Sequence, residues 1–142
     1  MSLKILLSGA RGRMGKAIHS IASEHDCEIS FPVDLGDNPE EGIEDCDVVI
    51  DFSLRDATRS LAMLAKKYNK PMVIGTTGHE KDDRTTIEEL SSSIPMVWAG
   101  NFSTGVNLLF FLTQQAAKVL DLNSGFDPEV IETERKIILE ER

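Results

Sequence analysis

The stretch KILLSGARGRMGKAIHS, residues 4–20, places three glycines between an apolar run and a segment with helical periodicity. A nucleoside-triphosphatase loop requires four residues between its first and last glycine, followed by Lys and then Ser or Thr, whose hydroxyl reaches magnesium. Here five residues separate Gly9 from Gly15, and Ala17 follows Lys16. The spacing and the missing hydroxyl argue against a triphosphatase loop and favour a dinucleotide-binding turn.

Each of the three glycines has its own use in a dinucleotide-binding turn between a strand and a helix. Gly9 permits the tight turn, Gly12 lets the backbone approach a pyrophosphate, and Gly15 lets the helix pack close to the sheet. Asp34 ends the next apolar run, 19 residues after Gly15, where a carboxylate can accept hydrogen bonds from an adenosine ribose. Glycines also mark ordinary turns, and Asp34 could simply begin the turn in DLGDNP, so the pattern alone leaves both interpretations open.

Short β-rich apolar runs alternate with helical patterns along the rest of the chain. This alternation predicts an α/β fold with a Rossmann-like, doubly wound parallel sheet that is covered on both faces. We expect strands at residues 3–8, 28–33, 47–53, 71–76 and 95–100, and helices at residues 12–25, 55–68, 82–92 and 105–122. The last helix is the most apolar, so we expect it to be deeply packed.

The composition narrows the function classes. A length of 142 residues is about one domain and is short for a dehydrogenase, which usually adds a substrate domain. The net charge of −9 disfavours nucleic acid as a partner, and no apolar run approaches the roughly 20 residues that span a bilayer. Two cysteines without CxxC spacing, and a start without a secretory pattern, favour a reduced, cytoplasmic protein. The three histidines are scattered, so we expect no metal site.

Four sequence blocks carry a family resemblance: SGARGRMG, VVIDFS, VIGTTG and NFSTGVN. In this order and spacing they resemble 4-hydroxy-tetrahydrodipicolinate reductase, and the resemblance extends from residue 4 to about residue 133. Members of that family are NAD(P)H-dependent oxidoreductases of bacterial lysine and diaminopimelate biosynthesis. The resemblance therefore implies NADH or NADPH as the cofactor and a cyclic dicarboxylate as the small-molecule substrate.

The resemblance also implies which residues contact the cofactor. Asp34 would hold the adenosine ribose, and the phosphates would be cradled by Gly9, Ala10, Arg11, Gly12, Arg13 and Met14. The nicotinamide side would be formed by Gly75, Thr76 and Thr77 together with Ala99, Gly100, Asn101 and Phe102. Judged from the residue types alone, the two nicotinamide-side groups also fit turns whose threonine or serine caps a following helix.

The end of the chain departs from the family pattern. After VIET the family continues with two histidines and then a lysine three positions later, but Glu134, Arg135 and Ile138 stand at those positions here. We therefore assign no catalytic residue to this chain. We expect a dinucleotide-binding domain at residues 1–127, followed at residues 128–142 by the start of a truncated or altered substrate and oligomerisation domain.

Two functions from different classes fit these observations. The chain is either the cofactor-binding half of a reductase, with negligible turnover by itself, or a non-catalytic NAD(P)H-binding module. The apolar residues 137–139 need burial against missing residues or against a second copy, so a homo-oligomer is an open alternative. Because Leu35 rather than an arginine follows Asp34, we expect NADH to bind as tightly as NADPH or more tightly, with Arg11 and Arg13 partly offsetting the repulsion of a 2′-phosphate.

Overall fold

The computed structural model describes residues 2–120 and residue 125. Its centre is a sheet of five parallel strands in the order β2-β1-β3-β4-β5. The strands are β1 (Leu3–Ser8), β2 (Cys27–Val33), β3 (Val48–Asp51), β4 (Met72–Ile74) and β5 (Met96–Trp98). The helices are α1 (Arg13–Ile21), α2 (Arg55–Lys67), α3 (Lys81–Leu90) and α4 (Thr104–Val119), with short 3₁₀ turns η1 (Ala22–His25) and η2 (Pro39–Glu41).

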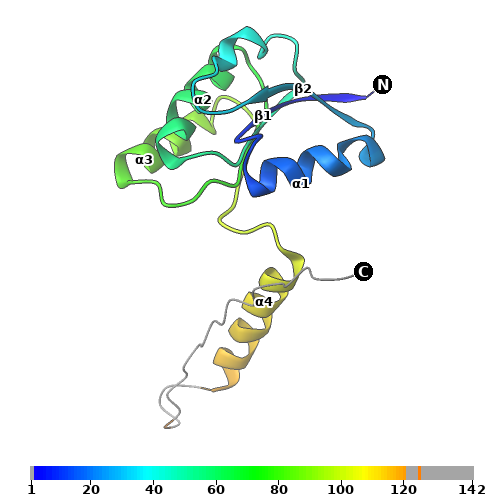
Figure 1. Cartoon of the computed structure of the whole chain (residues 1–142). Helices are drawn as coiled ribbons and strands as arrows, with labels where there is room; N and C mark the ends of the chain where they lie inside the picture. The colour runs from blue at the N-terminus through cyan, green and yellow to red at the C-terminus, as the bar shows by residue number, and fades with distance from the viewer. Residues whose placement is uncertain (1, 121–124, 126–142) are drawn as a thin grey trace. The chain divides into compact units, whose positions relative to one another are not determined.

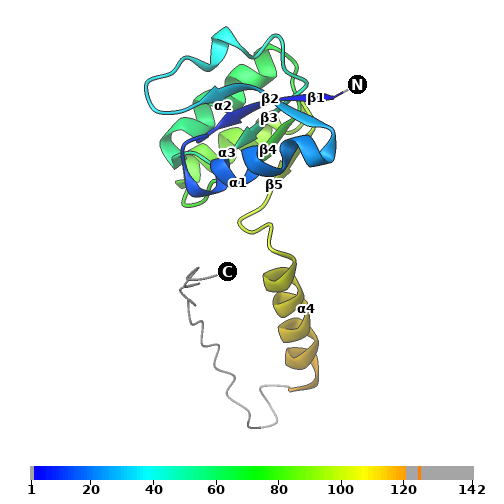
Figure 2. The same cartoon turned by 45° about the vertical axis from the view of Figure 1, so that its right-hand side comes forward.

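The strand order reverses direction at β1, and this reversal determines where the helices lie. The chain moves from β1 outward to β2 on one side, then returns to β3 on the other side of β1 and continues outward to β5. Because crossovers between parallel strands are right-handed, α1 lies on one face of the sheet, and α2 and α3 lie on the other. Figure 1 and Figure 2 show this division. The predicted Rossmann-like, doubly wound fold is confirmed.

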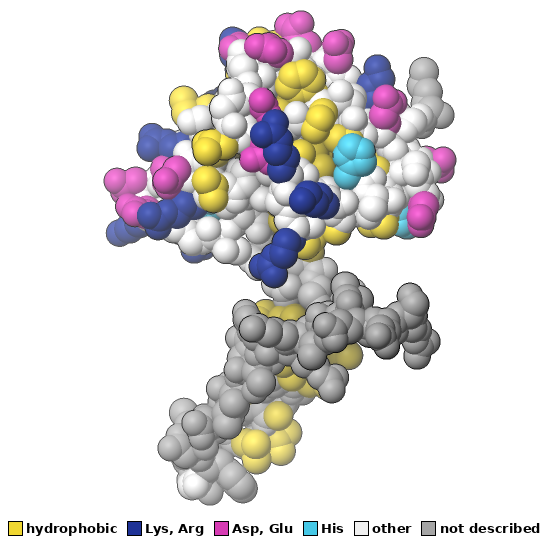
Figure 3. All heavy atoms as spheres, viewed as in Figure 1, with side chains coloured by type: hydrophobic (Ala, Val, Ile, Leu, Met, Phe, Trp, Pro, Cys, Tyr) yellow, Lys and Arg dark blue, Asp and Glu magenta, His cyan; other side chains and the backbone are white. Residues whose placement is uncertain are grey.

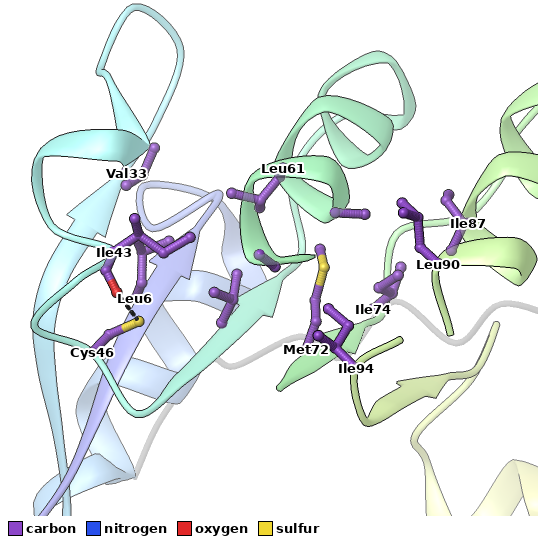
Figure 4. Packing of buried hydrophobic residues seen from close by; sticks show 13 residues of the cluster. Leu6, Val33, Ile43, Cys46, Leu61, Met72, Ile74, Ile87, Leu90 and Ile94 are labelled. Carbon is purple, nitrogen blue, oxygen red and sulfur yellow. Dashed lines mark hydrogen bonds between the residues drawn. The ribbon is translucent and has the colours of Figure 1, made fainter. Parts of the chain in front are cut away.

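The main hydrophobic core lies between the sheet and the helices α2 and α3. Leu6 of β1, Val49 of β3 and Ile74 of β4 are completely buried there, and Leu61 of α2 and Ile87 of α3 pack over them (Figure 4). Alternate residues of β1 are buried on opposite faces, since side chains of a strand alternate and both faces of this sheet are covered. The central strands therefore hold the carboxyl edge of the sheet in a fixed position.

The predicted elements are all present among the described residues, with small differences at their ends. Three predicted strands stop earlier than expected, at Asp51, Ile74 and Trp98. The residues that follow them leave the sheet and form loops at its carboxyl edge, which pattern alone does not separate from strand. The first helix ends at Ile21 and continues as η1, which closes on Asp26 in the left-handed conformation (φ 55°).

The chain divides into two compact units, Met1–Phe102 and Ser103–Arg142. The helix α4 falls in the second of these units. The expected domain boundary at residue 127 stays a prediction. The expectation that this helix is deeply packed is wrong, since none of its residues is buried. Its apolar side chains surround most of the helix, among them five consecutive residues 108–112, and Figure 3 shows hydrophobic side chains on its surface. The predicted tail at residues 128–142 lies outside the described residues.

Candidate functional site

The glycine turn after β1 is built as the spacing predicted. Gly9 adopts the left-handed conformation (φ 80°), and its N–H donates to Val33 O at 2.9 Å, so it ties the end of β1 to β2. A Cβ on Gly9 would collide with the carbonyl of Phe52, and a Cβ on Gly15 would lie 2.6 Å from Ala10 Cα. Both positions therefore require glycine for the protein's own packing.

Gly12 is less crowded than the other two glycines. A Cβ there would meet only Gly9 O, at 3.2 Å. Gly12 is also the N-cap of α1, where no side chain caps the helix and no acidic residue lies in the first turn. The first backbone N–H groups of α1 therefore lack intrahelical partners and point out of the helix end, which is the arrangement that binds an anionic group.

Asp34 lies beside this turn, at the end of β2. Its Oδ2 accepts the N–H of Arg11 at 2.8 Å, and its Oδ1 accepts the N–H of Leu35 at 2.9 Å. The hydrogen bonds from Leu35 and then Arg11 lower the pKa of Asp34, so the carboxylate is ionised at neutral pH. Each carboxylate oxygen retains a second lone pair and can still accept a hydrogen bond from a ligand.

A cleft of about 550 Å³, called the main cleft here, opens where the strand order reverses between β1 and β3. Its walls are the glycine turn with Gly9 and Gly12, the loop 33–40 that includes Asp34, and the α2 residues Ala57, Ser60, Leu61 and Leu64. Ligands of open α/β sheets bind at this reversal, beyond the carboxyl ends of the strands. The volume lies within the usual range of small-molecule sites.

The loop wall of the main cleft is joined to the α2 wall by a three-residue cluster. The Glu40 carboxylate accepts hydrogen bonds from the Lys67 ammonium and from Tyr68 Oη, the latter at 2.8 Å. The Lys67 Nζ atom also lies 4.9 Å from the centroid of the Tyr68 ring. Lys67 first, and then Tyr68, lower the pKa of Glu40, while Glu40 raises the pKa of Lys67.

The predicted nicotinamide-side residues after β4 line two smaller hollows in the same unit. Gly75, Thr76 and Thr77 line a hollow of about 450 Å³ with Phe52 and residues 53–56, called the threonine hollow here. Thr76 and Thr77 also line a hollow of about 290 Å³ with His79, Arg84, Trp98 and Gly100, called the tryptophan hollow here. The structure therefore brings the predicted group 75–77 next to Gly100.

The remaining predicted residues do not all lie in these cavities. Phe102 packs its ring edge-on against Phe52, with 5.9 Å between the ring centroids, but Ala99, Asn101 and Phe102 line none of the four cavities described here. Ala10 and Arg11 line a fourth hollow of about 270 Å³ with Asp34 and Asp37, called the arginine hollow here. Arg13 and Met14 are exposed on α1 and line none of the four.

The segment after β3 was missing from the predicted site. Phe52, Ser53 and Leu54 line both the main cleft and the threonine hollow, so they lie between the group predicted to hold the adenosine and the group predicted to hold the nicotinamide. Asp51 fixes this segment: its carboxylate is fully buried and accepts the N–H of Ser53 at 3.0 Å and the hydroxyl of Thr58 at 2.6 Å. The block VVIDFS and the rule that sites lie at strand carboxyl ends were the signals that could have identified it.

Two further findings describe the same part of the chain. No helix among the described residues has the length and apolar character that crossing a membrane requires. Among residues 2–120, no group of three or more His, Cys, Asp or Glu side chains is arranged to hold a metal ion.

Comparisons with known proteins agree with this geometry. The family model described as "Dihydrodipicolinate reductase, N-terminus" matches residues 3–102. The 4-hydroxy-tetrahydrodipicolinate reductase of Akkermansia muciniphila is 42% identical over 131 residues, with 92% of this chain and 52% of the relative covered. The reductase of the same name from Caldanaerobacter subterraneus subsp. tengcongensis is 37% identical over 142 residues, with 93% and 55% covered. The chain spans about half the length of the curated relatives it matches.

A solved structure gives the same result for the fold. The dipicolinate-bound dihydrodipicolinate reductase from Paenisporosarcina sp. TG-14 superposes with a TM-score of 0.65 at 25% sequence identity, covering 82% of this chain and 54% of that one. The family model accounts for 100 of the 142 residues, which include the whole sheet and every cavity described above. The chain therefore belongs to the dihydrodipicolinate reductase family.

Proposed function

We propose that residues 3–102 bind a nicotinamide dinucleotide along the carboxyl edge of the sheet, as the cofactor-binding part of a 4-hydroxy-tetrahydrodipicolinate reductase. One observation carries this proposal: the main cleft begins at a glycine turn whose second glycine is the uncapped N-cap of α1 and is much less crowded than Gly9 and Gly15. The packing explains why Gly9 and Gly15 must be glycine, but it does not explain Gly12. Close approach of a ligand to the uncapped end of α1 explains it.

The residues present fit the parts of a dinucleotide in order along the edge. The pyrophosphate would lie over Gly12 and the first N–H groups of α1, and the adenosine would lie in the main cleft, with Asp34 accepting hydrogen bonds from the ribose hydroxyls. The apolar surfaces of Leu61 and Leu64 on α2 would contact the adenine. Every one of these groups belongs to the first compact unit.

The nicotinamide would lie on the other side of Phe52, against residues 75–77 and 99–102. Gly75 has no room for a side chain, because a Cβ there would collide with the Phe52 ring. Thr76 is held in place by its hydroxyl, which contacts Asp51 O at 3.4 Å, while Thr77 is exposed and can donate a hydrogen bond to a carboxamide. When bound, the reduced nicotinamide supplies the hydride for the reduction. The residues of this chain orient the ring.

The charges around Asp34 favour NADH over NADPH. A 2′-phosphate on the adenosine ribose would lie beside the carboxylate of Asp34, which is repulsive, and Leu35 supplies no compensating cation. The Arg11 side chain lies next to Asp34 and Asp37, and its Nη2 is already 3.6 Å from Asp37 Oδ2. We therefore expect both cofactors to bind, with NADH at least as tight as NADPH.

The substrate and pathway follow from the relatives. We propose that the protein reduces 4-hydroxy-tetrahydrodipicolinate, a cyclic dicarboxylate, in the cytoplasm as a step of lysine and diaminopimelate biosynthesis, because its relatives carry that enzyme name. The alternative is a non-catalytic NAD(P)H-binding module. It predicts no turnover even when substrate-binding groups are supplied, whereas the reductase hypothesis predicts turnover.

Cofactor binding is tested by energy transfer from Trp98, the single tryptophan of the chain, to bound NADH. The wild-type chain should show saturable transfer, and Gly12→Val should abolish it without unfolding, because the new side chain would occupy the pyrophosphate position. Gly105→Val is a matched control, since a Cβ there would meet nothing closer than Ser103 Oγ at 3.8 Å. Equal NADH affinity in wild type and folded Gly12→Val would overturn the assignment.

The reductase assignment is tested with a chimera. Residues 1–102 of this chain would replace the matching segment of the Akkermansia muciniphila reductase, and NADH oxidation would be followed with 4-hydroxy-tetrahydrodipicolinate. Turnover is expected, and Gly12→Val in the chimera should eliminate it. A folded chimera that binds NADH without turnover would favour the non-catalytic module.

A further inference from the structure

The turn after β2 carries two carboxylates, Asp34 and Asp37, which have different partners. Asp34 has both oxygens engaged by backbone N–H groups, from Leu35 and Arg11. Asp37 lies three residues later, and its Oδ2 accepts the N–H of Asp34 at 2.9 Å, while its own N–H donates to Asp34 O at 3.0 Å. Gly36 between them adopts the left-handed conformation (φ 94°). The turn therefore fixes both carboxylates at the same rim of the main cleft.

The Arg11 guanidinium is drawn to Asp37 rather than to the cleft. Its Nη2 lies 3.6 Å from Asp37 Oδ2, and the two side chains line the arginine hollow together with Asp34. Asp34 and Asp37 line the main cleft as well, whereas Arg11 does not. The Arg11 side chain is 73% exposed, so it can take another direction if Asp37 no longer attracts it.

The loop 33–40 contains no lysine or arginine that could offset the negative charges of Asp34 and Asp37. Glu40 also lines the main cleft, but its carboxylate is already paired with Lys67 and Tyr68. Position 35, directly after Asp34, is an exposed leucine. The rim next to the proposed ribose position therefore presents two carboxylates and one arginine, and that arginine contacts one of the carboxylates.

We propose that Asp37 is a specificity-determining residue that disfavours NADPH by engaging Arg11, which would otherwise contact the 2′-phosphate. The inference rests on the proposed dinucleotide site and adds to it a residue that acts through Arg11. Asp34 discriminates by repulsion at short range, and Asp37 discriminates by pairing with the Arg11 guanidinium. Arginine is well suited to bind a phosphate when it is released, because its planar fork donates two parallel hydrogen bonds.

The test compares NADH and NADPH affinities by calorimetry in wild type, Asp37→Asn and the double variant Asp37→Asn/Arg11→Gln. In Asp37→Asn the new amide keeps an oxygen that accepts the Asp34 N–H, so the turn is retained while the charge is removed. The ratio of NADPH to NADH affinity should rise about tenfold, which corresponds to about 1.4 kcal/mol. The double variant should lose that gain, because the gain requires the arginine.

Asp45→Asn is the matched control, since Asp45 is exposed, makes no ion pair among the described residues and removes the same charge. A ratio in Asp37→Asn equal to that in Asp45→Asn, or a gain that persists in the double variant, would overturn the role of Asp37. Those outcomes leave NADH binding intact and so differ from failure of the proposed function, in which the wild type binds neither cofactor and the inference falls with it. ADP-ribose and its 2′-phosphorylated form should repeat the ratio change.

Discussion

The two halves of the proposed site are built differently, although both lie on the same sheet edge. On the adenosine side, the glycine turn, Asp34 and the loop 33–40 hydrogen-bond to one another and enclose one large cleft. On the nicotinamide side, residues 75–77 and 99–102 line two smaller hollows or none, and Thr77, Gly100 and Phe102 are exposed. The first half is preorganised by the protein's own backbone, whereas the second leaves polar groups open to a ligand.

This difference determines what a substitution can report. On the adenosine side, one residue can both stabilise the fold and bind the ligand. The two contributions are separated by comparing a crowded position with a less crowded one. On the nicotinamide side, an exposed residue can be changed without cost to the fold, and its effect appears in nicotinamide binding alone. Phe52 lies between the two halves and lines cavities of both.

The largest contrast is expected between two glycines of the same turn. Gly15→Ala should lower the free energy of unfolding by about 3 kcal/mol, because its Cβ would lie 2.6 Å from Ala10 Cα and the backbone must shift. Gly12→Ala should cost no more than about 1 kcal/mol, since it changes an exposed N-cap whose Cβ would meet one atom, Gly9 O at 3.2 Å, and a shift of a few tenths of an ångström relieves that contact. Urea denaturation of both variants measures this. Equal destabilisation would contradict the separation of a packing glycine from a ligand glycine.

Asp51 is expected to matter about as much to the fold as Gly15, since it fixes the segment that both halves share. Asp51→Ala would leave the buried Thr58 hydroxyl and the Ser53 N–H without their acceptor, which should cost about 2–3 kcal/mol of unfolding free energy. Asp47→Ala provides the comparison, because Asp47 accepts one N–H, that of Lys4, at an exposed position. Thermal or urea unfolding should rank Asp51→Ala well above Asp47→Ala, and the reverse ranking would refute the role of Asp51.

Thr77 tests the nicotinamide side with a smaller effect. Thr77→Val keeps the shape and removes one hydroxyl, so NADH should bind about two- to tenfold more weakly, the range of one lost hydrogen bond. ADP-ribose, which lacks the nicotinamide, should bind as in wild type. Thr85→Val is the control, because Thr85 lies on α3 and donates to Lys81 O away from the cavities. A parallel loss of ADP-ribose affinity would show that Thr77 acts on the whole fold.

The smallest effect is expected at the Glu40 cluster, where the two charged partners, Glu40 and Lys67, are exposed and solvent screens their charges. Lys67 lowers the pKa of Glu40, so the stability this contact adds is present above the ordinary value of 4.5 and is lost as pH falls through the lowered pKa. Lys67→Met should therefore shift the urea midpoint slightly at pH 7, and this shift should shrink as the pH is lowered below 4.5. Lys66→Met, one residue away, should not shift the midpoint. A shift that stays the same as the pH falls would exclude the ion pair as its cause.

Much of the fold followed from residue patterns because the relevant signals are local. The alternation of apolar runs and helical periods placed every strand, and the glycine spacing placed the turn after β1. The nicotinamide side depended on the family resemblance, since GTTG and AGNFS differ little from ordinary turns in composition. The deep packing of α4 was wrongly expected. An apolar pattern predicts that a helix tends to be buried, but it does not show which residues bury it.

Other parts of the site depend on contacts between residues that are distant in sequence. Glu40 meets Lys67 across 27 positions, and Arg11 meets Asp37 across 26. Neither pairing leaves a pattern in a single sequence, and the role of Phe52 as a wall of two cavities appears only once β1 and β3 are adjacent. These are the features that the structure adds to the sequence.

The most direct test of the two-part site is a titration of the ¹⁵N-labelled chain, followed by NMR amide shifts. With NADH, the account predicts saturable shifts at Gly9–Gly15 and Asp34 together with residues 75–77 and 99–102. With ADP-ribose, the first group should shift and the second should not. Shifts confined to other surfaces, or no shifts at millimolar NADH in a folded protein, would contradict the assignment of this sheet edge as the dinucleotide site.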